Sequence, residues 1–170
     1  GEALAVPVIK QLKEWSLSDA AGSITILDSP PGTSCPMVET VAGADFVLLV
    51  TEPTPSGLHD LQLARDVLLE LDIPAGVVVN RDGTGYQELE DSCAESGLPV
   101  LMRIPFERRV AEGLARGETL LEVRPHYAPR FRVLATDIEA LLPPVERSPS
   151  PASAGHGGSE LELPMGGRSS

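Results

Sequence analysis

Short apolar runs alternate with helix-like patterns along the first 142 residues, and this alternation limits the fold more than any other feature. The runs lie at 23–28, 45–51, 75–80 and 99–104, and three of them are nearly continuous apolar stretches. Such runs are typical of strands that are buried on both faces of a sheet. Because helical patterns separate them, we predict an α/β fold: a doubly wound, mainly parallel sheet with helices on both faces.

The helical patterns are recognised by apolar residues that recur every three or four positions, so that each helix has one apolar face. The sets are Leu4, Val8, Leu12 and Trp15; Leu61, Ala64, Leu68 and Leu71; Tyr86, Leu89 and Cys93; and Phe131, Leu134, Ile138 and Leu141. We expect a helix at each set.

Residues 143–170 differ in composition from the rest of the chain. They hold 5 Pro, 5 Gly and 6 Ser, without apolar periodicity. This composition is typical of disordered segments. We therefore expect one domain over residues 1–142 and a disordered Pro/Gly/Ser-rich tail over residues 143–170.

Charge and cysteine content narrow the classes of partner. The chain has 25 acidic and 13 basic side chains, a net charge of -12, which disfavours a protein that binds nucleic acid through phosphate contacts. No apolar run approaches the roughly 20 residues of a membrane span, so we expect no membrane partner. The 2 cysteines exclude a disulfide framework and favour a reducing, cytoplasmic setting.

Residues that could bind a ligand or take part in a reaction follow the apolar runs, at the strand ends where such folds bind ligands. The first run ends at Asp28, and Pro30, Pro31 and Gly32 follow it. A carboxylate there suits Mg²⁺, and a glycine N–H can approach an anion closely. An ordinary strand-to-helix turn also favours Asp, Pro and Gly. We favour the functional interpretation because these residues follow a predicted buried strand.

Two longer strings resemble a known family. The strings D-S-P-P-G-T-S-C-P and G-A-D-F-V-L-L-V-T-E-P-T-P-S-G-L-H-D-L are similar to the Walker B and switch II region of MinD/ParA-type P-loop ATPases. They resemble most the subgroup that carries an inserted ferredoxin-like domain with 4Fe-4S clusters. The similarity runs from about Gly1 to Leu142, so residues 1–142 would form the C-terminal portion of a nucleotide-binding ATPase domain.

The resemblance implies roles for the first strand end. Asp28 matches the catalytic Walker B carboxylate that holds Mg²⁺ through water. Gly32, next to Pro31, matches the switch glycine whose N–H senses the γ-phosphate of ATP. Binding of ATP and Mg²⁺ would then drive a conformational switch or a homodimer.

The resemblance also implies a base pocket. Asn80, with Arg81 beside it, matches the asparagine that hydrogen-bonds adenine, and Pro105 and Phe106 match the segment that lines the pocket. A carboxamide offers both the donor and the acceptor that adenine requires. An Asn that caps a strand-to-helix turn is the alternative.

One element of the family is absent from the sequence. The 170 residues contain no G-K-[ST] and no Gly-rich loop with a lysine, and hence no Walker A motif. We expect the chain alone neither to bind ATP tightly nor to hydrolyse it. By the same resemblance, the 4Fe-4S cluster would lie in the portion of the family's proteins that this sequence does not include. We also expect marginal solubility, because an incomplete sheet exposes the backbone of its edge strand.

Cysteine and histidine give weaker signals. Cys35 is either a redox-responsive thiol or cluster ligand, or a small buried residue at a helix start. Cys93 is expected in the core. His59 and His126, the latter in the basic cluster 124–132, are expected to be solvated.

The resemblance therefore implies the ATP-binding part of an iron–sulfur-associated ATPase that couples hydrolysis to electron transfer or cluster handling. Such a function would imply a ferredoxin-type or other redox partner. Two alternatives stay open: an iron–sulfur cluster carrier or amidotransferase-like relative, and a non-enzymatic interaction module.

Overall fold

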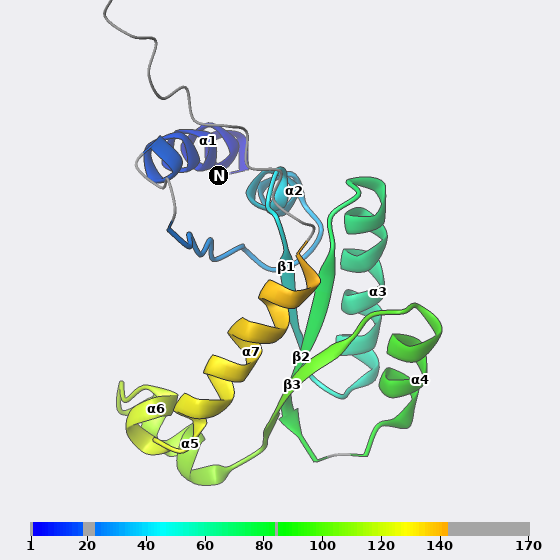
Figure 1. Ribbon diagram of the computed structural model, residues 1–170, viewed down its shortest axis with the longest axis vertical. Helices are drawn as coiled ribbons and strands as arrows, with labels where there is room; N and C mark the ends of the chain where they lie inside the picture. Colours follow the sequence, from blue (N-terminus) through cyan, green and yellow to red (C-terminus); the bar gives the residue numbers. More distant parts are fainter. Residues whose placement is uncertain (1, 19–22, 84, 143–170) are drawn as a thin grey trace, which may run out of the picture.

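The computed structural model describes residues 2–18, 23–83 and 85–142 (Figure 1). The strands β1 (Val47–Thr51), β2 (Ala75–Asp82) and β3 (Val100–Pro105) form a parallel sheet in the order β1-β2-β3. The described helices are α1 (Glu2–Ser18), α2 (Cys35–Val41), α3 (Pro55–Glu70), α4 (Gln87–Glu95), α5 (Arg108–Ala115), α6 (Leu120–Val123) and α7 (Tyr127–Leu141). The predicted α/β fold with a parallel sheet is therefore confirmed, and residues 143–170 lie outside the described part.

One face of the sheet packs against α3 and α4. Val77 and Val79 of β2 are fully buried there, in contact with Leu61 of α3 and with Leu89 and Cys93 of α4. Because side chains alternate along a strand, this face takes every second residue of β2. The predicted core position of Cys93 is confirmed.

The opposite face packs against α7. Val78 of β2 and Met102 of β3 form a buried cluster with Tyr127 and Leu134 of α7. The Arg130 guanidinium donates a hydrogen bond of 2.8 Å to the carbonyl of Arg103, which ties α7 to β3. Helices therefore cover both faces of the sheet, as the sequence predicts (Figure 1).

A third buried cluster lies beyond these two layers. Met37 and Val41 of α2 pack there with Leu68 of α3. The helix α1 packs on α2 and reaches its carboxyl end, where Lys13 Nζ donates hydrogen bonds to main-chain carbonyls. Figure 1 shows α1 beside α2, at the end of the molecule away from α5 and α6.

The strand predicted over residues 23–28 is not present. This segment has no regular secondary structure, and its Ile24 and Ile26 side chains are 79% and 89% exposed. A strand needs a partner for its backbone N–H and C=O groups, and none of β1, β2 and β3 pairs with this segment. The prediction that Asp28 closes a buried strand is therefore wrong for this structure.

The helix predictions are correct in place but incomplete. α1, α3, α4 and α7 coincide with the predicted apolar sets. α2 was expected only as a helix start at Cys35, and α5 and α6 were not predicted as helices. The apolar face of α1 is not buried, because Val8, Leu12 and Trp15 are all exposed. No helix within the described ranges is long and apolar enough to span a bilayer.

Candidate functional site

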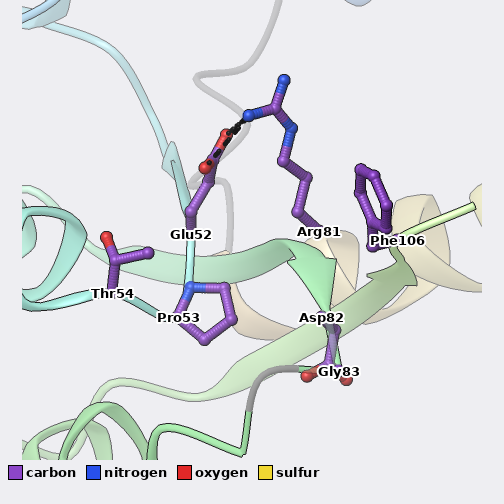
Figure 2. Close-up of a pocket in the computed structure, with 7 residues that line it drawn as sticks. All are labelled: Glu52, Pro53, Thr54, Arg81, Asp82, Gly83 and Phe106. Atoms are coloured by element: carbon purple, nitrogen blue, oxygen red, sulfur yellow. Dashed lines mark hydrogen bonds and ion pairs between the residues drawn. The ribbon is translucent and has the colours of Figure 1, made fainter. Parts of the chain in front are cut away.

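A pocket of about 410 Å³ opens at the carboxyl ends of all three strands (Figure 2). A volume of this size falls in the range of small-molecule sites, about 300–1,000 Å³. Parallel α/β sheets bind their ligands at this edge. The lining residues are Glu52, Pro53, Thr54, Arg81, Asp82, Gly83 and Phe106.

Arg81 reaches the pocket through an irregularity in β2. The pairing of β2 with β3 shifts register between Asn80 and Asp82, and Arg81 between them has a φ of 53°. A positive φ is costly for a residue with a side chain, and such strain is concentrated at functional sites. The bulge turns the Arg81 side chain toward the end of β1, where its Nη1 lies 3.3 Å from Glu52 Oε1.

Phe106 places an exposed aromatic ring at the edge of the pocket. Its side chain is 62% exposed, and it directly follows the last residue of β3, Pro105. The Phe106 N–H donates a hydrogen bond of 2.8 Å to the carbonyl of Asp82, so that the ends of β2 and β3 are held together. Figure 2 shows the side chains of Arg81 and Phe106 extending on the same side of the pocket. A flat, partly apolar ring can stack there.

Asp82 belongs to a network of charges behind the pocket. Arg103 Nη1 lies 3.8 Å from Asp82 Oδ2, and the same guanidinium forms two hydrogen bonds with the Glu90 carboxylate. The hydrogen bonds with Glu90 raise the pKa of Arg103 above its ordinary value, and the charges of Glu90 and Asp82 act in the same direction. Arg103 therefore stays cationic and holds Asp82 at the pocket.

The charge of the lining favours a neutral part of a ligand. Among the lining residues, Glu52 and Asp82 carry carboxylates, and Arg81 carries the guanidinium. A phosphate group next to two carboxylates would be repelled. An uncharged group with hydrogen-bond donors, such as a nucleoside, suits this composition better.

Glu52 is a pocket residue that the sequence analysis missed. It belongs to a string that carries the family resemblance, T-E-P-T-P-S-G, but no role was inferred for it. A carboxylate directly after a buried strand is the same signal that drew attention to Asp28. That signal would have identified Glu52 as well.

The structure brings only part of the predicted site together. Arg81 and Phe106 line the pocket, and Asn80 and Pro105 directly precede them in the chain but are not lining residues. The other predicted residues, Asp28, Pro31 and Gly32, lie on the exposed segment before α2 and do not line the pocket. Gly32 has a φ of 88°, a conformation that glycine adopts without strain.

The cysteines and histidines divide as follows. Cys35 is the first residue of α2, as expected, but it is exposed, so the expectation of a buried residue there is wrong. His59 and His126 are exposed, as predicted. Within the described ranges no three His, Cys, Asp or Glu residues are grouped so as to hold a metal ion.

Comparisons with known proteins agree with this fold. No family model matches the chain. The structure is similar to that of the cell division ATPase MinD of Pyrococcus furiosus, with a TM-score of 0.54 and 29% identity over 67% of this chain and 50% of that one. It is also similar to the MinD cell division protein of Aquifex aeolicus, with a TM-score of 0.56 and 20% identity over 80% of this chain and 58% of that one.

Two proteins are similar to this chain in sequence over part of their length. An uncharacterized protein of Methanocaldococcus jannaschii is 32% identical over 122 residues, 72% of this chain and 42% of the relative. A cytosolic Fe-S cluster assembly factor NUBP1 homolog of Caenorhabditis briggsae is 29% identical over 140 residues, 69% of this chain and 45% of the relative. The chain thus spans less than half the length of these two relatives.

The fold therefore defines the class of protein: a P-loop NTPase-like α/β fold of the MinD/ParA type. Over the matched part, the sequence is 29% identical to that of a MinD ATPase. The relatives of known name do not distinguish the subgroup with an inserted 4Fe-4S domain.

Proposed function

We propose that this chain is the ATP-binding part of a MinD/ParA-type ATPase, and that the pocket at the strand ends receives the adenosine of ATP. The observation that carries the proposal is the strained Arg81 beside the exposed Phe106, at the meeting point of three parallel strands. The similarity to a MinD ATPase supports the choice of ATP.

Each residue has a role that its chemistry permits. Phe106 stacks on the adenine ring. Asn80 directly precedes the lining residue Arg81, and in this proposal its carboxamide turns into the pocket when the base binds and offers the paired donor and acceptor that adenine needs. Arg81 holds the Glu52 carboxylate by an ion pair at the side of the pocket next to β1, and Pro105 orients Phe106.

Asp28 and Gly32 serve the phosphate end of the nucleotide in this proposal. Mg²⁺ keeps most of its waters and needs only one or two protein carboxylates besides phosphate oxygens, so that a single exposed Asp28 fits it. A bound Mg²⁺ would neutralise phosphate charge. Gly32 presents a backbone N–H that no Cβ obstructs.

The ATP-driven switch, dimerisation and hydrolysis belong to a protein that also carries a phosphate-binding loop with a lysine. That loop contributes most of the binding and stabilisation of the phosphates. The 170 residues hold no such motif. We therefore propose that this chain alone binds the nucleoside part weakly and does not turn ATP over.

A titration of the chain with adenosine and with ATP, followed by NMR chemical shifts, tests the proposal. We expect adenosine to shift the resonances of the pocket residues with a dissociation constant of about 1 mM, a binding free energy of about −4 kcal/mol. ATP should bind no more tightly than adenosine. Phe106→Ala should weaken binding about 5- to 160-fold, since stacking on an aromatic ring contributes about 1–3 kcal/mol per base.

Phe131→Ala is the matched control, because Phe131 is a partly exposed phenylalanine of α7 that does not line the pocket. It should leave binding unchanged. Adenosine that shifts no pocket resonance, or equal losses in the two variants, would contradict the proposed site. Mg²⁺-dependent ATP turnover by the chain would contradict the proposal that it does not hydrolyse ATP alone.

An iron–sulfur role is a second candidate, favoured by the similarity to an Fe-S cluster assembly factor. The chain offers the exposed Cys35 and the buried Cys93, so that it does not by itself supply the four thiolates of a 4Fe-4S cluster. A cluster carried by this protein would need cysteines from another chain or segment. Reconstitution of the chain with iron and sulfide, read by its visible absorption, should give no cluster unless such cysteines are added.

A further inference from the structure

The backbone of Glu52 is fixed more firmly than its place in a loop requires. Its carbonyl accepts a hydrogen bond of 2.8 Å from the N–H of Thr54. The Thr54 hydroxyl in turn caps α3 by accepting from the N–H of Gly57 at 3.0 Å. A Cβ on Gly57 would lie only 2.2 Å from the Glu52 carbonyl oxygen, so the turn closes tightly around this residue. Glu52 therefore stands at a defined point at the end of β1.

The Glu52 side chain is held toward the pocket. Its carboxylate forms an ion pair with Arg81, which the bulge in β2 directs to the same place (Figure 2). The carboxylate remains 40% exposed, so that it keeps lone pairs for a ligand. An ionised carboxylate only accepts hydrogen bonds. Its partner in a ligand must therefore be a donor, such as a hydroxyl or an amine.

The position of Glu52 in the sheet favours the sugar over the base. Phe106 lies at the end of β3, and Glu52 follows β1, with β2 between them. Two strand spacings span about 10 Å, comparable with the length of a nucleoside. A base that stacks on Phe106 therefore has its sugar on the side of Glu52. The sugar hydroxyls are the donors nearest to the carboxylate.

We propose that Glu52 accepts hydrogen bonds from the ribose hydroxyls of the bound nucleoside and selects ribonucleosides over 2′-deoxyribonucleosides. The inference rests on the proposed function, since it assumes that the pocket holds a nucleoside. Arg81 holds the carboxylate in position before the ligand binds. A hydrogen bond to a charged group contributes about 1.5–3 kcal/mol net, which corresponds to a preference of about 12- to 160-fold.

The test compares the dissociation constants of adenosine and 2′-deoxyadenosine, measured by NMR titration of the chain. The unmodified chain should prefer adenosine by the factor given above. Glu52→Ala should abolish the preference by weakening adenosine binding alone. Glu112→Gln is the control, because it removes the carboxylate of another exposed Arg–Glu pair, that with Arg108, away from the pocket. It should keep the preference. If Glu52→Ala does not fold, Glu52→Met, which keeps a long side chain but replaces the carboxylate by a weakly accepting thioether, is judged by the same criteria.

The remaining outcomes separate this inference from the proposed function. Equal binding of the two nucleosides by the unmodified chain would overturn the inference and leave the nucleoside site in place. Equal losses for both nucleosides in Glu52→Ala would mean that Glu52 reads the base or only supports Arg81, which also overturns it. Binding of neither nucleoside would overturn the proposed function and this inference together.

Discussion

Gly57 shows how one residue without a side chain shapes the candidate site. Its position on the first turn of α3 leaves no room for a Cβ beside the Glu52 carbonyl. We expect Gly57→Ala to lower the free energy of unfolding by about 1–2 kcal/mol, because the overpacking cost exceeds the gain in helix propensity of about 1 kcal/mol. Urea unfolding of the variant measures this. Ser56→Ala, at an exposed neighbour on the same turn, should change stability by no more than about 0.5 kcal/mol.

The two cysteines differ in reactivity for a physical reason. Burial raises the pKa of the Cys93 thiol, and the negative charge of Glu90 adds to the effect. The thiolate is the reactive form, so Cys93 should resist a thiol reagent in the folded chain while the exposed Cys35 reacts. We expect one labelled thiol under native conditions and two in denaturant. Loss of all native labelling in Cys35→Ser is the control, and rapid labelling of Cys93 in that variant would contradict its burial.

The same shift predicts a pH dependence of stability. A thiol whose pKa is raised on folding stays protonated in the native state while the unfolded thiol ionises near 9.0. The contribution of Cys93 to stability is therefore complete below this value and is lost as the pH rises above it. Urea unfolding as a function of pH should show a steeper alkaline decline for the unmodified chain than for Cys93→Ala. Equal declines would show that Cys93 does not contribute.

At the scale of elements, Lys13 joins α1 to α2. Its Nζ donates hydrogen bonds to the carbonyls of Glu39, at 2.8 Å, and of Ala42, at 2.6 Å, at the carboxyl end of α2. A cation there satisfies carbonyls that the helix leaves without partners. We expect Lys13→Met to release α1, at a cost of about 1–2 kcal/mol, a 5- to 30-fold change in the opening equilibrium.

Hydrogen exchange measures this release, as faster exchange of the α1 amides with unchanged exchange in β2. Lys10→Met is the control, since Lys10 forms only an exposed ion pair of 3.7 Å with Glu39. Such a pair contributes little. Similar exchange of α1 in both variants would contradict the role of Lys13.

The strands that sequence patterns predicted correctly are those whose apolar runs pair in the sheet. Helices cover β2 on both faces, and β1 packs through Leu48 and Leu49, although its Val50 is 64% exposed. The segment 23–28 has the same pattern, yet it forms no strand, because pairing depends on a neighbour that local sequence does not specify. α6 was missed although Thr119 and Glu122 form a capping box, a pattern that sequence does reveal.

The pocket residues were also predicted only in part from the sequence. Arg81 and Phe106 were predicted from their resemblance to a family motif, and both line the pocket. The contribution of Glu52 depends on the bulge in β2 and on the close approach of Gly57, which no local pattern of charge or polarity indicates. Sequence thus predicted the residues at the strand ends better than the contacts between them.

At the scale of the whole molecule, exposed apolar side chains lie on several elements, and the most exposed ones among the described residues lie on β1 and the segments before it. Trp15, Ile26 and Val50 are 75%, 89% and 64% exposed, and β1 is an edge strand of the described sheet. Exposed edges and apolar groups promote association between copies. We therefore expect the chain to self-associate with rising concentration, despite its net charge of -12.

Ile24→Ser combined with Ile26→Ser should reduce this self-association, since it removes the two most exposed isoleucines of the segment before α2. Light scattering after size exclusion, over a range of concentrations, measures the effect. Leu121→Ser is the matched control, because Leu121 is an exposed apolar residue on α6, apart from that segment in the fold (Figure 1). A chain that stays monomeric at every concentration would contradict the prediction. An equal effect of Leu121→Ser would show that association depends on total apolar exposure and not on the region around β1.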